Sequence, residues 1–235
     1  MHTLWQDIRY GVRVLLKRPA FTAIAVITLA LGIGACTAIF SVVDAVLVRP
    51  LPYRDAERIV SLKEIDGTGR QTTFAEPNFV DVRARSHSFS GVAEYVMGLM
   101  PVIGGSAAVR TNVAYVSTDF FMTLGVQPAV GRTFAPEEAK LGGEAVAVVS
   151  YGYWRTLLGN RTDLAAIHLR VGNRSHTVVG VMPAGFSFPK DAEIWIPIEQ
   201  LPSGASRRSH GKRVIARLRD GVTLAQARAD VYCTD

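Results

Sequence analysis

The longest apolar run of the chain covers residues 20–43 and contains no charged side chain. Its twenty-four residues are enough to cross the roughly 30 Å hydrocarbon core of a bilayer as a helix, which needs about 20. Asp44 interrupts the pattern, residues 45–48 are apolar again, and Arg49 with Pro50 ends it. The pattern therefore predicts a transmembrane helix over residues 20–48.

Three other interpretations of this run were weighed. A cleaved signal sequence has an apolar region of only about 7–15 residues, much shorter than this one. Residues 33–36 faintly resemble a lipoprotein cleavage box, but twelve more mostly apolar residues follow Cys36. A buried core helix rarely extends this far without a charge. The length and the flanks favour a membrane span.

Basic residues flank the span more densely on its N-terminal side, at Arg9, Arg13, Lys17 and Arg18. The positive-inside rule then predicts a cytoplasmic N-terminus, with the rest of the chain outside the cytoplasm. Residues 1–19 also have an amphipathic pattern, typical of an interfacial helix on the cytoplasmic side of the membrane. Pro19 favours a break between this helix and the span.

Short alternating segments follow the span and predict a mixed α+β domain over residues 49–235. Ser150 is the expected N-cap of a helix over 151–158, and Gly125 is expected to end a helix over 120–124 that Thr118 and Asp119 cap. The remaining expected helices are 77–85 and one that begins at Thr223. The expected strands are 59–65, 91–97, 109–116, 145–149, 167–171, 177–181, 193–198 and 213–218.

The net charge of +6 does not indicate nucleic-acid binding, because it is concentrated before residue 20 and in the segment 207–219. Residues 49–206 carry fifteen basic and fifteen acidic side chains and lack a basic face interleaved with aromatics. The two cysteines, Cys36 and Cys233, offer no disulfide within the domain. The domain must therefore be held together by its own core.

The sequence predicts no catalytic, cofactor or metal site. The five histidines lack metal-binding helical spacing, and neither a GxxxxGK[ST] loop nor a GxSxG elbow occurs. His168 and His176 fall on neighbouring expected strands and could meet across a hairpin, but surface histidines are the better interpretation. ATP hydrolysis is thus expected from another subunit.

Small residues recur every four positions along the span, at Ala30, Gly34 and Ala38. Such a stripe lets another transmembrane helix approach closely. Ordinary transmembrane composition is the alternative, since alanine and glycine are common in these helices. We predict helix packing along this stripe.

An ordered series of motifs resembles the MacB/FtsX-like permeases of ABC transport systems, in the acidobacterial-type form. The resemblance covers nearly the whole chain. Its motifs are DIRYGVR from Asp7, KRPAFT from Lys17, TLALGIGA from Thr28, RPLPY from Arg49, VSTDFF from Val116, GRTF from Gly131, VVSYGYW from Val148, TVVGVMP from Thr177, FSFP from Phe186 and IWIP from Ile194.

This resemblance implies a single N-terminal transmembrane helix followed by a MacB-like periplasmic core domain. It implies residence in the bacterial inner membrane, an ABC ATPase subunit, and further permease helices or copies as partners, with no nucleic acid. The domain would transmit ATP-driven movement to export or to the release of a lipoprotein or other substrate. Three membrane helices that follow the domain in this family are missing here, so the chain is expected to be an N-terminal portion, inactive alone. An anchored extracytoplasmic enzyme or binding domain is the alternative.

Overall fold

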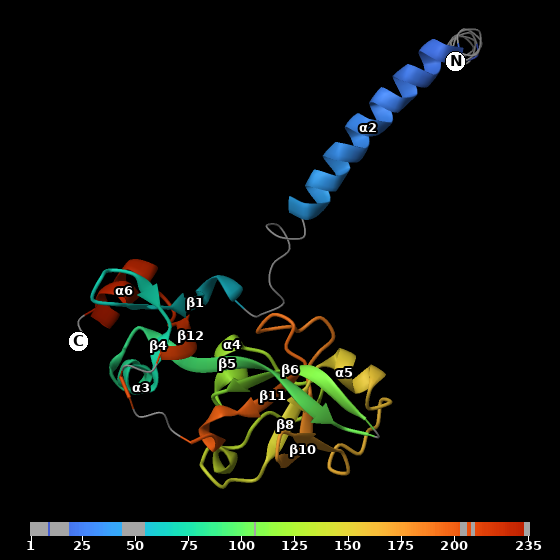
Figure 1. Ribbon diagram of the computed structural model, residues 1–235. Helices are drawn as coiled ribbons and strands as arrows, with labels where there is room; N and C mark the ends of the chain where they lie inside the picture. The colour runs from blue at the N-terminus through green and yellow to red at the C-terminus, as the bar shows by residue number, and fades with distance from the viewer. Residues whose placement is uncertain are drawn as a thin grey trace. The chain divides into compact units, whose positions relative to one another are not determined.

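The computed structural model describes residue 9 and residues 19–43, 55–105, 107–202, 206–207 and 210–232. The chain divides into two compact units, residues 1–51 and residues 52–235 (Figure 1). The described part of the first unit is dominated by one long helix, α2. The second unit is a folded domain with a mixed sheet.

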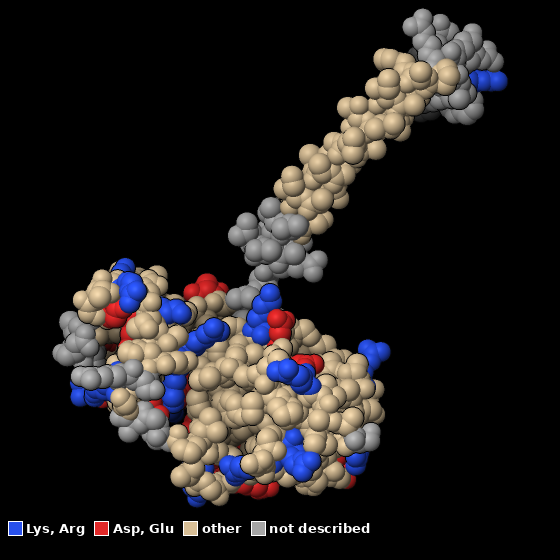
Figure 2. Space-filling view, in the orientation of Figure 1, with Lys and Arg blue, Asp and Glu red and all other residues tan. Residues whose placement is uncertain are grey.

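Helix α2 runs from Pro19 to Val43 and carries no charged residue. At 1.5 Å per residue its 25 residues span about 37 Å. The hydroxyls of Thr28 and Thr37 donate to carbonyl oxygens one turn earlier, at 2.9 and 2.8 Å, so neither needs another partner. Figure 2 shows no charged atoms along this helix, whose apolar side chains are exposed. It is long and apolar enough to cross a membrane.

The predicted transmembrane helix is thus present as a helix over Pro19–Val43, while residues 44–48 lie outside the described residues. The interfacial helix predicted over residues 1–19 also lies outside them, apart from Arg9 and Pro19. Pro19 begins α2, as expected for a proline that can occupy a first helical turn.

The folded unit alternates short strands with short helices. Its helices are α3 Glu76–Arg85, α4 Phe120–Leu124, α5 Tyr151–Thr156 and α6 Leu224–Tyr232, with single 3-10 turns at Ala56–Arg58, Pro136–Glu138 and Ile198–Gln200. Its strands are β1 Ile59–Leu62, β2 Glu64–Ile65, β3 Gln71–Thr72, β4 Phe74–Ala75, β5 Phe89–Ile103, β6 Ala108–Val116, β7 Val130–Gly131, β8 Val146–Val149, β9 His168–Val171, β10 Arg174–Val181, β11 Ile194–Pro197 and β12 His210–Leu218.

Six strands close into a barrel. Strand β5 pairs with β6, β6 with β11, β11 with β8, β8 with β10, β10 with β9, and β9 returns to β5. Because β9 pairs with β5, the ring is closed and none of its six strands is a free edge strand. Two of the pairings, β6 with β11 and β8 with β10, are parallel, so the ring is mixed.

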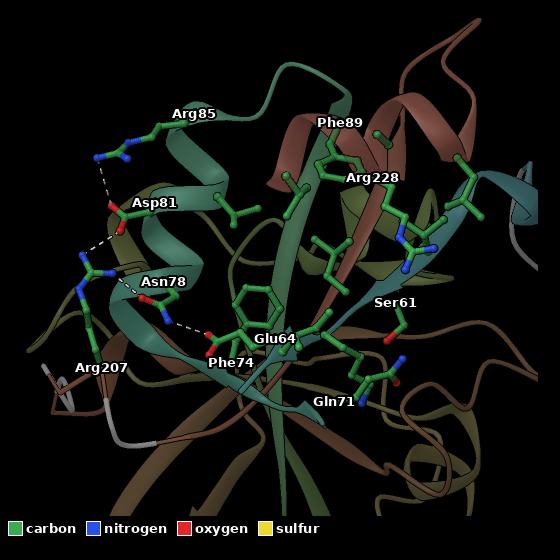
Figure 3. Close-up of a pocket in the computed structure, with 18 residues that line it drawn as sticks. Ser61, Glu64, Gln71, Phe74, Asn78, Asp81, Arg85, Phe89, Arg207 and Arg228 are labelled. Carbon is green, nitrogen blue, oxygen red and sulfur yellow. Dashed lines mark hydrogen bonds and ion pairs between the residues drawn. The ribbon is translucent and has the colours of Figure 1, made fainter. Parts of the chain in front are cut away.

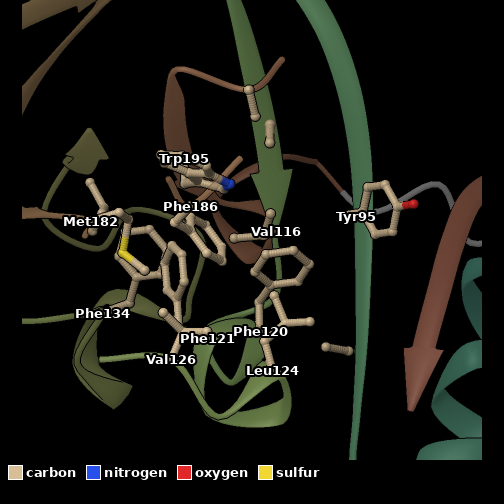
Figure 4. Close-up of a cluster of buried hydrophobic side chains, with 14 of the residues drawn as sticks. Tyr95, Val116, Phe120, Phe121, Leu124, Val126, Phe134, Met182, Phe186 and Trp195 are labelled. Atoms are coloured by element: carbon tan, nitrogen blue, oxygen red, sulfur yellow. The ribbon is translucent and has the colours of Figure 1, made fainter. Parts of the chain in front are cut away.

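Two strands of this ring, β8 and β11, are buried on both faces. In β8, Ala147 and Val149 belong to one hydrophobic cluster, while Val146 and Val148 belong to another. Because strand side chains alternate between faces, one cluster lies on the inner side of the ring and the other on its outer side. The outer cluster is rich in aromatic rings from α4, β11 and the connecting loops, as Figure 4 shows for Phe121 and Trp195.

A smaller lobe lies beside the barrel, built on β1, β4, β12 and the first half of β5, with helices α3 and α6 (Figure 1). Its core contains Phe74, Phe79, Phe89 and Ala227 among other buried side chains. Strand β5 serves both parts, because it pairs with β12 up to Tyr95 and with β6 from Tyr95 onward. One continuous strand of 15 residues therefore joins the lobe to the barrel.

The structure confirms the α+β class and corrects several local expectations. The strand expected to end at Met97 continues through Pro101 to Ile103, because β6 and β9 both pair with this extension. The strand expected over residues 59–65 is interrupted at Lys63. Helix α4 ends at Gly125 with φ 68°, as predicted. Its Asp119 makes no side-chain cap and instead pairs with Arg83 at 3.0 Å.

Candidate ligand groove

An open groove of about 960 Å³ lies on the smaller lobe, between β1, the β2–β3 hairpin, α3 and α6 (Figure 3). Its volume falls within the range of small-molecule sites, about 300–1,000 Å³. Nine of its eighteen lining residues are apolar, namely Val60, Leu62, Ile65, Phe74, Val82, Phe89, Leu224, Ala227 and Val231. The groove is the place where the core of this lobe is left partly open.

The apolar floor follows from the periodicity of the elements around it. Val60 and Leu62 share one face of β1, and both are only half-buried against the core. Ala227 and Val231 stand four residues apart and so lie on one side of α6, the first buried and the second half-buried. Val82 comes from α3. The floor is therefore assembled from three separate elements.

A chain of polar contacts forms the rim along α3. Arg207 donates to Asp81 Oδ2 at 2.8 Å and to Asn78 Oδ1, and Arg85 lies 4.0 Å from the other oxygen of Asp81. Asn78 in turn donates from Nδ2 to Glu64 Oε1 at 3.0 Å. Figure 3 shows these side chains in one row along the helix. Both carboxylates of the groove are thus engaged by neighbouring donors.

Glu64 has two further partners that fix it at the base of this rim. The backbone N–H of Ala75 donates to Oε1 at 2.9 Å, and Nε2 of His210 lies 3.0 Å from Oε2. These contacts tie the β2 strand to β4 and to the start of β12. The Glu64 side chain therefore fixes the position of the β2–β3 hairpin beside the groove.

Asp230 holds α6 against the end of α3. Its Oδ2 accepts hydrogen bonds from the Ser86 hydroxyl at 2.6 Å and from the backbone N–H groups of His87 and Ser88 at 3.0 and 2.9 Å. The Ser86 hydroxyl is the main cause that lowers the pKa of Asp230 to about 2, because all these bonds favour the carboxylate. One wall of the groove is thus anchored by an ionised side chain.

A partly buried ion pair links the shared strands β5 and β12 beside α3. Lys212 Nζ contacts Glu94 Oε1 at 2.9 Å and Glu76 Oε2 at 3.4 Å. Only 6% of the Glu94 side chain is exposed. Burial raises the pKa of Glu94, and the hydrogen bond and charge of Lys212 oppose that shift. The pair cross-links β12 and β5 near the junction of lobe and barrel.

The predicted packing residues Ala30, Gly34 and Ala38 all lie on α2 and are exposed. Neither glycine of this helix, Gly32 or Gly34, has an atom close to where a Cβ would stand. The stripe therefore remains a prediction about a partner helix.

The two histidines that the sequence places on neighbouring strands do not come together. In the β9–β10 pairing His168 stands opposite Thr177, whereas His176 stands opposite Leu169. Adjacent positions of a strand face opposite sides, so one histidine is exposed and the other buried. Burial lowers the pKa of His176. Over the described ranges, no cluster of three or more histidine, cysteine, aspartate or glutamate side chains is arranged for a metal ion.

The groove could not be predicted from the sequence, because its residues come from β1, α3, residue 207 and α6, up to 171 positions apart (60 to 231). One local signal was present. Asn78, Asp81 and Arg85 are spaced three and four residues apart and so form a polar stripe along the helix expected over 77–85. What that stripe faces is decided by α6 and the loop at Arg207.

Comparison with known proteins adds three kinds of likeness. Residues 22–231 match the family model of the MacB-like periplasmic core domain. A probable syringafactin export ATP-binding/permease protein of Pseudomonas syringae pv. tomato is 28% identical over 187 residues, which cover 71% of this chain. The chain spans only 28% of that relative's length.

Solved structures share the fold at low sequence identity. The periplasmic region of MacB from Actinobacillus actinomycetemcomitans matches with a TM-score of 0.59 and 11% identity, over 74% of this chain and 80% of that one. The extracellular domain of the noncanonic ABC-type transporter YknZ from Gram-positive bacteria matches with a TM-score of 0.55 and 15% identity, over 73% and 88%. At these identities the likeness concerns the fold alone.

Proposed function

The chain belongs to the family of MacB-like periplasmic core domains, and on this premise we propose that it is the membrane-anchored extracytoplasmic part of an ABC-type permease. The observation that carries the proposal is one chain that joins an apolar helix of membrane-spanning length to this domain. The relatives that match are transporter and permease proteins.

The proposed organisation follows the sequence. Residues 1–19 form the cytoplasmic-side interfacial helix, residues 20–48 the transmembrane helix and residues 49–235 the core domain. The N-terminus is cytoplasmic, and the domain lies in the periplasm or its equivalent. The bacterial inner membrane then holds the protein, in agreement with the uncharged surface of α2.

The proposed role is mechanical. An ABC ATPase subunit hydrolyses ATP on the cytoplasmic side, and the domain passes the resulting movement to cargo in export or in lipoprotein or substrate release. Strand β5 supports this role, because it runs unbroken through lobe and barrel and so connects them through one continuous strand. The domain itself performs no covalent chemistry in this proposal, and the chain needs its partners for activity.

The relative from Pseudomonas syringae is named for export of syringafactin and for ATP binding as well as permease function. Those activities belong to a protein of which this chain covers a minor part. For this chain we propose the same division of labour, in which other segments or subunits supply the ATPase and the remaining transmembrane helices.

We propose further that Ala30, Gly34 and Ala38 form the face of α2 against which those helices pack. The Gly34→Leu variant is expected to weaken association about tenfold, because a leucine side chain on this face prevents close helix approach. Full chain in lipid nanodiscs would be titrated with the C-terminal helices of a matched permease, and binding followed by energy transfer between fluorophores.

Gly32→Leu provides the matched control. Position 32 is two residues away, so its side chain points to a different face of the same helix, while the added volume is identical. Unchanged association for Gly32→Leu with weakened association for Gly34→Leu supports the proposed face. Equal losses in both variants, or none in either, contradict it.

A further inference from the structure

We propose that the groove between β1, α3 and α6 binds an anionic single-chain amphiphile, with its hydrocarbon chain on the apolar floor and its anionic group at the basic rim. The inference names a ligand for this domain and rests on the proposed function only in regarding that ligand as cargo. The binding itself is argued from the lining of the groove.

The floor of the groove is apolar and only partly buried. Val60, Leu62 and Val231 are half-buried around the fully buried core side chains of the lobe. A chain of methylene groups laid along them would remove this remaining apolar surface from water. Such burial contributes about 25 cal/mol per Å². A flexible linear hydrocarbon can follow an open floor assembled from β1, α3 and α6, whereas a rigid polycyclic ring needs one flat face.

The rim of the groove carries more positive than negative charge. The lining includes four basic residues, Lys63, Arg85, Arg207 and Arg228, against two acidic ones, Glu64 and Asp81. The two carboxylates are engaged within the protein, Asp81 by Arg207 and Glu64 by Asn78 and a backbone N–H. The eighteen lining residues therefore carry a formal charge of +2, four positive minus two negative, and the ionised Asp230 of the adjoining wall lowers the sum to +1. Charge complementarity selects an anion.

The positive charge of the rim lies at the edge of the apolar floor. Arg228 lies on α6, one residue after the buried Ala227. Lys63 comes directly after Leu62, the last residue of β1. Figure 3 shows the Arg228 side chain over the groove, between α6 and the strand that carries Ser61. Basic groups thus stand at the edge of the apolar surface on more than one side. An ionic headgroup can meet them without leaving the hydrocarbon chain in water.

The test uses the full chain in nanodiscs of neutral phosphatidylcholine, without ATP or partner proteins. The probe is a palmitic acid that carries a photoreactive diazirine on its chain, and labelled peptides are mapped by mass spectrometry. Labelling is expected on residues 60–65, 74–89 and 224–231, and unlabelled palmitate should displace it. A probe with the same chain ending in an alcohol should label these segments at least about fivefold less, since it lacks the anion.

Three variants sharpen the result. Leu224→Trp fills the groove from an exposed position on the same face of α6 as Ala227 and Val231, and is expected to reduce labelling at least about tenfold. Arg228→Glu reverses one rim charge and is expected to reduce it about fivefold. Arg110→Glu, an exposed change on β6 that does not line the groove, is the matched control and should leave labelling unchanged. Far-ultraviolet circular dichroism establishes that each variant is folded, and Lys63→Glu replaces Arg228→Glu if the latter is not.

Each outcome decides the proposal. Groove labelling that requires the acid and is lost in Leu224→Trp supports it. Labelling confined to α2 means partition into lipid, and equal labelling by acid and alcohol removes the anionic preference; either result overturns it. If the groove is not labelled because a second copy of the chain covers it, the proposal is also overturned. Because the assay involves no transport, groove labelling combined with failure of the permease proposal would leave the binding site intact.

Discussion

The Gly180→Ala variant is expected to lose about 3 kcal/mol or more of domain stability, which lowers the melting temperature by roughly 10 °C. Gly180 of β10 stands directly opposite Gly131 of β7. A Cβ at position 180 would overlap the carbonyl oxygen of Arg132, and a Cβ at 131 would overlap that of Val179. Both obstacles are backbone atoms, which no rotamer change can move.

The damage is expected to spread from this strand pair into the outer core. Strand β7 leads into the loop that carries Phe134, which contacts Phe121 with ring centroids 5.7 Å apart. Displacing β7 therefore opens the aromatic cluster shown in Figure 4. Near-ultraviolet circular dichroism of the full chain, sensitive to the buried Trp195, would follow thermal unfolding.

Gly211→Ala is the control for this substitution. Gly211 lies in β12, and no atom lies within 4 Å of the position that its Cβ would take. A change of less than about 0.5 kcal/mol is expected there. If Gly180→Ala melts at the same temperature as Gly211→Ala, the close approach of β7 and β10 does not exist in the folded protein.

The Lys212→Met variant is expected to lose about 3 kcal/mol of stability at neutral pH, because it leaves Glu94 buried without its cation. Glu94 accepts from Lys212 at 2.9 Å, and its other oxygen is buried without a hydrogen-bond partner in the described structure. Methionine keeps the length of the side chain, so the main loss is the charge. Urea unfolding of the full chain would measure it.

The same variant should show a defined pH dependence. Burial raises the folded-state pKa of Glu94 above the ordinary value of a glutamate side chain, about 4.5, and removal of Lys212 raises that pKa further. A carboxyl group whose pKa is raised by folding contributes stability that is fully present below about pH 4.5. This stability is lost as the pH rises through the folded-state pKa. The deficit of Lys212→Met should therefore shrink as the pH falls toward 4.5.

A double variant separates charge from packing. Adding Glu94→Gln to Lys212→Met removes the uncompensated charge and should restore most of the stability at pH 7. The account of a buried ion pair fails if Lys212→Met is as stable as the unsubstituted chain, or if its deficit does not depend on pH.

Features set by neighbouring residues were predictable from sequence. The apolar run predicted α2, and Ser150 caps α5 by accepting from the backbone N–H of Tyr153 at 3.0 Å. Gly125 adopts the left-handed conformation that ends α4. In each case the decisive interaction lies within a few residues of the chain, so the local pattern contains the information.

Features set by distant partners were not predictable. The strand expected to end at Met97 continues through Pro101, because β6 and β9 supply partners on both sides. The buried charge of Glu94 depends on a lysine 118 residues away. The groove likewise requires α6 to be tied to the end of α3 by Asp230, a contact between residues 144 positions apart. A single sequence does not specify which of many charged residues meet.

We propose that α2 anchors the MacB-like domain of this chain outside the cytoplasm. Fusing alkaline phosphatase, or alternatively green fluorescent protein, after residue 235 in a Gram-negative host tests this directly. The phosphatase fusion should be active and the fluorescent fusion dark, and deletion of residues 19–43 should abolish the phosphatase activity. A bright fluorescent fusion with an inactive phosphatase fusion would contradict the account.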